Sequence, residues 1–319
     1  MVKAVDRARE IGASAMQIFS DNPTAWKRRA EPPPELAAFR RGLHEFDIAP
    51  VSIHASYLVN LSGSNPESFE RSIVMLAHEL RQAPTFGARI VNVHIGSHLG
   101  VGVAAGIERL ADGILRTLQA VDAPPTDDDA ATEGAPPTDD GAGDLGPAML
   151  VLENSAGSGG GLGTSVDELA GIAEAIAARG VDPERVGFCF DTAHAWGAGI
   201  DVATPAAIDD TMAAFDKSIG LERLVMVHLN DSRSEFGSRT DRHEHLGAGR
   251  IGPAGLAHML CHPGLAHAAY ILETPGMDEG YDAINLARAR ALATGEQLES
   301  LPAAAFQLRG SAKARTAPA

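Results

Sequence analysis

A repeated alternation of short apolar runs with helix-like stretches constrains the fold of this chain more than any other feature of its sequence. The apolar runs predict buried parallel strands, because a strand covered on both faces is apolar along its whole length. Such runs lie at residues 15–19, 49–54, 89–95, 148–154, 186–192, 223–230 and 269–273. Strands and helices in alternation indicate right-handed β-α-β units that build one parallel sheet.

Helical patterns precede the first of these strands and follow each of them. They cover residues 2–12, 34–45, 67–86, 101–121, 164–179, 205–219, 253–262 and 279–293. Eight helices with seven strands favour an α/β fold of the TIM type, a (β/α)8 barrel that lacks its first strand. An open, doubly wound sheet is the alternative. We expect one barrel domain over residues 1–307.

Two segments fall outside this pattern. The hexapeptide APPTDD occurs twice, from Ala123 and from Ala135, in a stretch of Pro, Asp, Gly, Ala and Thr that has almost nothing to bury. We interpret residues 122–147 as a disordered acidic insertion. Residues 308–319 have a similar composition and are expected to form a disordered tail.

The formal net charge of −16 argues against a generally basic surface for nucleic acid. Eight of the acidic residues lie in the insertion, however, so a local positive groove elsewhere remains compatible with the sequence. Cys189 and Cys261 cannot form a disulfide framework, and the chain shows neither a leader pattern nor a long apolar window. We expect a cytoplasmic monomer with no membrane segment.

Histidines and carboxylates recur where the predicted strands end. These residues are His54, His94, Glu153, Asp191, His194, His228 and Glu273, and the loop after His228 adds Asp241 and His243. In a barrel all strand ends meet on one face, where active sites are built.

Each of these residues alone is weak evidence, because a single strand-end histidine is ordinarily a hydrogen-bonded core residue and Asp191 could cap a helix. Together they predict a metal centre, since buried carboxylates need a cation. Imidazole and carboxylate without thiolate suit Zn²⁺, with Mn²⁺ or Fe²⁺ as alternatives. Cys189, in a strand between two phenylalanines, is interpreted as a core residue.

The motifs that carry these residues resemble endonuclease IV, the family of metal-dependent apurinic/apyrimidinic endonucleases. The resemblance runs from about Ala4 to Leu292, and its most specific elements are DTAH and DRHEHLGAG. The other matching motifs are SYLVNL, NVHIGSHLG, LENSAG, VHLNDSRSEFGSRT and LETPG.

The resemblance implies a TIM barrel with three Zn²⁺ ions, for which Mn²⁺ is a possible substitute. The first ion would bind His54, His94 and Glu153. Glu153 would bridge to the second ion, held also by Asp191, His228 and Glu273, and the third would bind His194, Asp241 and His243.

The implied reaction is hydrolysis of the phosphodiester bond 5′ to an abasic site in duplex DNA, which leaves a 3′-hydroxyl. Glu153 and Glu273 are the expected catalytic residues, with Glu273 accepting or orienting the proton of the attacking water. Tyr57 matches a residue that the family uses near the minor groove. Arginines beside the ligands are candidate phosphate contacts: Arg233, Arg239, Arg242 and Arg250.

Three departures from the family are visible. The family opens with a strand and a glycine-rich loop, and here neither precedes Val2; Thr24 stands where the family often has a basic residue; and the net charge is negative. We therefore expect the native reading frame to begin upstream with a strand that closes the barrel. The chain as given is expected to express poorly, aggregate or have reduced activity.

Two other interpretations remain open. A sugar isomerase or epimerase of the same barrel class would use Glu153, Asp191, His228 and Glu273, but would leave His194, Asp241 and His243 unexplained. A non-catalytic DNA- or metal-binding remnant is the other alternative, because the first strand is missing.

We predict that deleting residues 123–146 leaves the melting temperature and the nicking rate nearly unchanged, since a solvated segment of this composition buries little. Thermal unfolding and an abasic-duplex assay measure both quantities. A large loss of stability would show that the insertion packs on the barrel.

Overall fold

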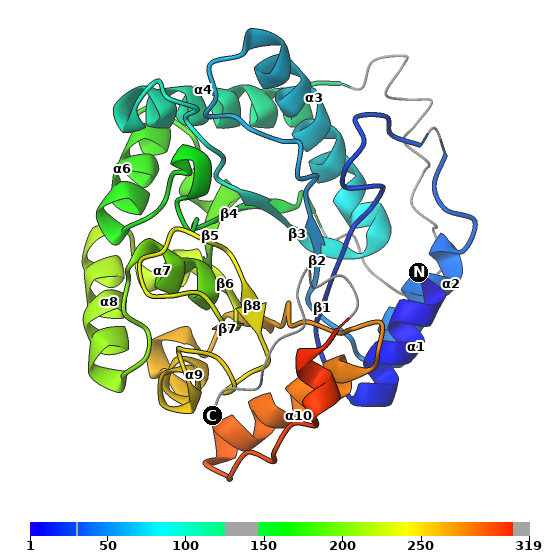
Figure 1. Ribbon diagram of the computed structural model, residues 1–319. Coiled ribbons are helices and arrows are strands. Elements are labelled where there is room, and N and C mark those ends of the chain that lie inside the picture. Colours follow the sequence, from blue (N-terminus) through cyan, green and yellow to red (C-terminus); the bar gives the residue numbers. More distant parts are fainter. Residues whose placement is uncertain (30, 125–145, 309–319) are drawn as a thin grey trace.

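A parallel sheet of seven strands forms the centre of the molecule (Figure 1). The computed structural model describes residues 1–29, 31–124 and 146–308. The strands follow the order of the chain around the sheet: β1 (Met16–Ile18), β2 (Val51–His54), β3 (Ala88–His94), β4 (Met149–Glu153), β5 (Val186–Asp191), β6 (Leu224–His228) and β9 (Ala269–Ile271).

Helices surround the sheet and pack mostly against their neighbours along the chain (Figure 1). Three of them begin with Asn65, Ser165 and Thr204, whose side chains accept backbone N–H groups of the first turn. The helices are α1 (Val2–Ile11), α2 (Leu36–Glu45), α3 (Pro66–Gln82), α4 (Val103–Asp122), α6 (Val166–Ala177), α8 (Pro205–Ser218), α9 (Pro253–Cys261) and α10 (Tyr281–Thr294). The predicted TIM-type barrel without its first strand is confirmed.

The strands bury side chains on both faces, as the continuous apolar runs predicted. One set packs against the helices, and a second, smaller set fills the inside of the barrel: Ile90, Val151, Cys189, Met226 and Ile271. Since side chains alternate along a strand, Val151 shares its face with Glu153, and Cys189 shares its face with Asp191. The inner apolar layer therefore lies directly below the polar strand ends.

The structure contains elements that the sequence pattern did not predict. The short helix α7 (Thr192–Ala198) begins directly after β5, and the two-stranded hairpin of β7 (Asp231–Ser232) and β8 (His243–Glu244) follows β6. The predicted helix 67–86 ends at Gln82 and continues as a 3₁₀ turn over Ala83–Phe86. Most of the acidic insertion and nearly all of the tail lie outside the described residues. Within the described part, no helix is both long and apolar enough to cross a membrane.

The barrel is open between β1 and β9, which are the two edges of the sheet. A cavity of about 930 Å³ lies between them, lined by α1, both strands and α10. Its wall is largely apolar and includes Ala15, Ile271 and Leu286. No backbone hydrogen bond joins these two edges among the described residues, and apolar side chains line both sides, so an eighth strand would fit in this gap.

We predict that an extension ahead of Val2, made of a strand-forming segment and a glycine-rich connection, raises the melting temperature by several degrees. The added strand would pair with both edges and fill the cavity. The matched control carries prolines at alternate strand positions, which cannot donate backbone hydrogen bonds. Equal melting temperatures for the two extended chains would show that the gap does not accept a strand.

Candidate metal centre

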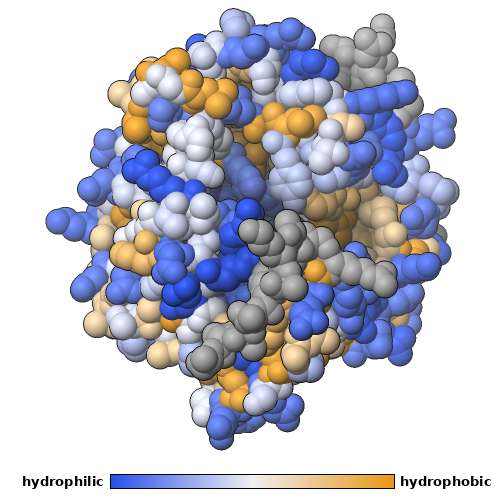
Figure 2. Space-filling model, in the orientation of Figure 1, coloured by the Kyte–Doolittle hydropathy of each residue, from blue (hydrophilic) through white to orange (hydrophobic). Residues whose placement is uncertain are grey.

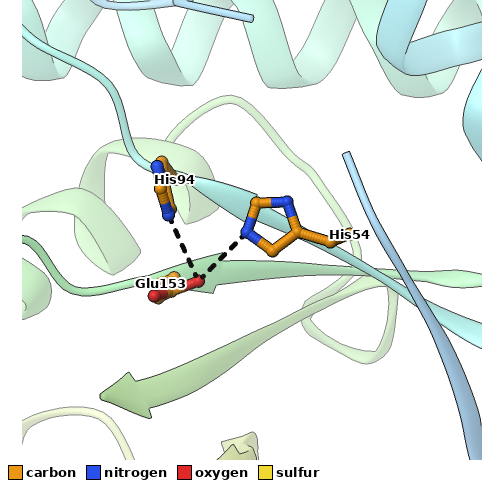
Figure 3. Close-up of side chains that lie close together, drawn as sticks. All are labelled: His54, His94 and Glu153. Carbon is orange, nitrogen blue, oxygen red and sulfur yellow. Dashed lines mark ion pairs between the residues drawn. The ribbon is translucent and has the colours of Figure 1, made fainter. Parts of the chain in front are cut away.

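Glu153, at the carboxyl end of β4, lies at the middle of a cluster of histidines. Its side chain is fully buried, and its Oε2 atom is 3.7 Å from Nε2 of both His54 and His94 (Figure 3). Its Oε1 atom is 3.1 Å from Nδ1 of His194 and 3.4 Å from Nδ1 of His228. One carboxylate thus faces four imidazoles that come from four different segments.

All nine side chains predicted as metal ligands meet around this carboxylate. Eight of them form three groups whose ligand atoms lie within 4.8 Å of one another: His54, His94 and Glu153; Glu153, Asp191, His228 and Glu273; and Asp191, His194 and His243. Asp241 borders the third group, 3.3 Å from Nε2 of His194 and 3.1 Å from Nε2 of His243. Beyond the expected sets, the geometry makes Asp191 a second shared carboxylate. A further group of Glu153, Cys189 and His228 lies toward the inner core.

The ring orientation of three histidines is fixed by a hydrogen bond on the side away from the carboxylates. Nδ1 of His54 is 2.7 Å from the carbonyl oxygen of the next residue, and Nδ1 of His243 is 2.8 Å from the carbonyl oxygen of Glu273. In both rings Nδ1 then carries the proton, which leaves the Nε2 lone pair free to bind a metal. In His228 it is Nε2 that carries the proton, because it faces the side-chain amide oxygen of Gln17 at 3.3 Å, and Nδ1 is the atom that faces the carboxylates.

Side-chain amides around the cluster were missed by the sequence analysis. Asn92 donates to Oε2 of Glu153 at 2.5 Å, and Asn230 donates to Oδ2 of Asp191 at 2.7 Å. Gln17, on β1, donates to Oε1 of Glu273 at 2.9 Å. Asn92 lies two residues before His94 on the same face of β3, so strand alternation could have found it.

The buried polar atoms of the cluster are incompletely paired. Oε1 of Glu153, Nδ1 of His228 and Nε2 of His243 have no hydrogen-bond partner among the described residues, although each is buried and faces other ligand atoms. Such atoms are costly to bury unless a partner completes them. Nitrogen and oxygen donors in this arrangement fit a cluster of divalent metal ions.

The pKa values show how strongly this centre favours positive charge. Burial raises the pKa of Glu153, but the imidazoles of His228 and His94 outweigh that effect and hold the pKa well below its usual range. Burial lowers the pKa of His243, but Asp191 and Asp241 outweigh it and raise the pKa to about 9. Without metal ions, protonated imidazoles therefore balance the carboxylates, and metal ions would take over that balance.

The rim of the centre is aromatic on one side and basic on the other. Tyr57 is 54% exposed, and its ring centroid is 5.3 Å from that of His54 and 6.0 Å from that of His94. Hydrophilic residues gather to the left of the middle of this face, and hydrophobic residues line the hollow to its right (Figure 2). Arg239 and Arg242 are exposed beside Asp241, whereas Arg250 forms an ion pair with Glu235 and Arg233 is partly buried.

A pocket of about 300 Å³ opens beside the first and third ligand groups. Its wall includes Tyr57, His94, Asn154, His194 and Asp241. The pocket connects the rim to the ligands and gives a small molecule or group access to them.

Comparison with known proteins bears on the fold and on the family of the chain. The family described as xylose isomerase-like TIM barrel matches residues 5–303. The chain is 39% identical to a probable endonuclease 4 of Methanoculleus marisnigri, over 91% of this chain and 94% of that protein. It is 40% identical to a probable endonuclease 4 of Halorhodospira halophila, over 88% of this chain and 86% of that protein.

Among solved structures, endonuclease IV from Thermus thermophilus matches with a TM-score of 0.73 and 36% identity, covering 92% of this chain and 94% of that one. A D-tagatose 3-epimerase-like protein matches with a TM-score of 0.58 but only 17% identity, which shows a shared fold alone. Because its sequence matches probable endonucleases 4 over nearly their whole length, the chain belongs to the endonuclease IV family of xylose isomerase-like TIM barrels.

Proposed function

We propose that the chain is a DNA repair endonuclease that hydrolyses the phosphodiester bond 5′ to abasic sites in duplex DNA, with three Zn²⁺ ions in the centre described above. The observation that carries the proposal is the shared, fully buried Glu153 with two histidines on one side and the Asp191, His228 and Glu273 group on the other. A single ion would leave most of these ligand atoms unused.

A phosphodiester is an anion that repels a hydroxide nucleophile. Bound Zn²⁺ ions would neutralise its oxygens, lower the pKa of water to roughly 7 and stabilise the leaving oxygen. The shared carboxylates of Glu153 and Asp191 would set the spacing between neighbouring ions.

Glu273 is proposed to accept or orient the proton of the attacking water. Its side chain is 29% exposed, at the edge of the cluster, and the Gln17 amide holds one of its oxygens. Burial raises the pKa of Glu273, but the nearby His228 imidazole outweighs that effect and lowers it to about 2. The carboxylate is therefore ionised at neutral pH and can accept a hydrogen bond from water.

Selection of an abasic site is proposed to depend on access to the ligands through the pocket beside them, which a sugar and its phosphate can enter. A sugar without a base has lost its stacking and pairing, so turning it out of the duplex costs less free energy than turning out an intact nucleotide. Tyr57 at the rim is proposed to contact the strand beside the lesion, and Arg239 and Arg242 to contact phosphates.

The alternative of a sugar isomerase or epimerase has only a shared fold in its favour. Such an enzyme would use the second ligand group, which is Glu153, Asp191, His228 and Glu273. In such an enzyme His54 and His94 would have no role, and neither would the cluster of His194, Asp241 and His243.

We predict that the purified chain nicks a duplex with one abasic site and leaves the undamaged duplex of the same sequence largely intact. Gel electrophoresis of end-labelled strands measures both rates, and the product strand should be extended by a polymerase because it ends in a 3′-hydroxyl. Equal cutting of both duplexes, or sugar isomerisation without cutting, would contradict the proposed function.

Glu153→Gln is predicted to remove metal from two sites at once and to abolish nicking, since the amide keeps the volume but not the charge shared by two ions. Inductively coupled plasma mass spectrometry gives the metal content per chain. Glu108→Gln, which changes an exposed carboxylate on α4, is the matched control. Full metal content and activity in Glu153→Gln would show that Glu153 bridges no ions.

A further inference from the structure

A second buried carboxylate lies outside the metal centre and has no part in the proposed reaction. Glu79, on α3, is only 2% exposed. Its Oε1 atom lies 3.5 Å from Nη1 of Arg28. The backbone N–H of Ser56 points at both carboxylate oxygens, with N···O distances of 3.2 and 3.4 Å.

These partners belong to two loops that follow neighbouring strands, residues 21–29 after β1 and residues 55–59 after β2, here called the rim loops. The rim loops also bind each other, because the carbonyl oxygen of Pro23 accepts from the Tyr57 N–H at 3.0 Å and from the Ser56 hydroxyl at 2.8 Å. Arg28 donates to the carbonyl oxygens of Asn22 and Ala25 within its own loop. One carboxylate therefore joins both rim loops to α3.

The rim loop over residues 55–59 lies at the mouth of the metal centre. Tyr57 stands half-exposed over His54 and His94, and its ring also contacts that of Phe19, with the centroids 5.4 Å apart. Tyr57 also lines the pocket that opens beside the ligands. Because the other rim loop is hydrogen-bonded to this one through Pro23, we expect the position of both loops to affect how a substrate meets Tyr57.

We propose that Glu79 is a positioning residue for substrate binding, whose ionised carboxylate holds the two rim loops, and Tyr57 with them, in the arrangement that grips abasic DNA. The proposal rests on the proposed function. Burying a charge against a single guanidinium is costly, and an apolar side chain could fill the space more cheaply. What an apolar side chain could not do is hold Arg28 and the Ser56 N–H at defined positions.

The charge state of Glu79 makes this role testable. Burial raises its pKa to about 7, while Arg28 and the Ser56 N–H lower the pKa and Asp21 raises it. Asp21 is itself paired with Arg29 at 3.5 Å. The carboxylate is thus ionised above neutral pH and loses its charge, and its hold on Arg28, as the pH falls below 7.

Two other charged or titratable groups lie near Glu79 along α3. Arg81 donates to the carbonyl oxygen of Ala120 on α4, and His78 is the other. The rim loop over residues 55–59 carries no acidic or basic side chain, whereas the loop over residues 21–29 also carries Lys27 and Arg29. Among the described residues, the ion pair to Glu79 comes from Arg28, which is therefore expected to respond to the charge of Glu79.

The experiment compares Glu79→Gln with the wild-type chain in steady-state nicking of an abasic duplex between pH 6 and pH 8.5. Glutamine keeps the volume of the side chain and an oxygen that can accept from the Ser56 N–H, but it carries no charge. We expect KM to rise about 5- to 10-fold at pH 8.5, with kcat within twofold of wild type and unchanged metal content. The ratio of the two KM values should approach one at pH 6, where wild-type Glu79 is protonated.

Glu70→Gln is the matched control, because Glu70 lies on the same helix and pairs with Arg116 at the surface. It should leave KM unchanged at every pH. If Glu79→Gln does not fold, as judged by circular dichroism, Arg28→Gln breaks the same ion pair and should give the same KM increase.

A folded Glu79→Gln with wild-type KM across the range, or with a KM increase that does not depend on pH, would overturn the positioning role. So would a wild-type KM for Arg28→Gln. A wild-type chain that fails to nick abasic DNA would instead overturn the proposed function, and this proposal with it.

Discussion

The charge of one fully buried carboxylate organises this molecule. Glu153 has no exposed surface, and its Oε1 atom has no hydrogen-bond donor among the described residues, so its charge must be balanced by cations held close by. A parallel barrel supplies them because every strand ends on the same face and each can deliver one imidazole or carboxylate. The amides of Asn92, Asn230 and Gln17 then fix the ligands, and the apolar layer beneath keeps water away from the base of the site.

The gap between β1 and β9 lies directly beside this centre. No backbone hydrogen bonds cross it in the described residues, yet Gln17 on β1 reaches Glu273, two residues beyond the end of β9, with a side-chain hydrogen bond of 2.9 Å. The two edges are therefore linked through the ligand cluster itself. Any movement of the edges changes the position of Glu273, so closure of the barrel and the geometry of the proposed catalytic carboxylate are coupled.

The fold and the ligands could be predicted because both depend on patterns along the chain. Apolar runs of strand length recur, and charged residues at their ends stand out against them, as Glu153 does after Met149–Leu152. Gln17 could not be recognised in the same way, because a single glutamine inside a strand does not distinguish a partly solvated face from a hydrogen-bonded one. Asn92 shares its strand face with His94, so the alternation along β3 does give a signal for it.

Glu79 shows a different limit. Glutamate is a good helix former, and in α3 it is indistinguishable by sequence from the exposed Glu70. Its burial arises only when the rim loops fold over the helix, which is a tertiary event. Likewise α7 is too short to give a periodic pattern, and it forms because the Asp191 side chain accepts the His194 N–H at 2.7 Å.

The metal content of the purified chain tests the central claim most directly. Protein equilibrated with Zn²⁺ and freed of excess metal should retain about three ions per chain, as two shared carboxylates with histidines on each side require. Anomalous scattering at the zinc edge should place all of them among the nine ligand side chains. A chain that retains a single ion, or none, would contradict the account.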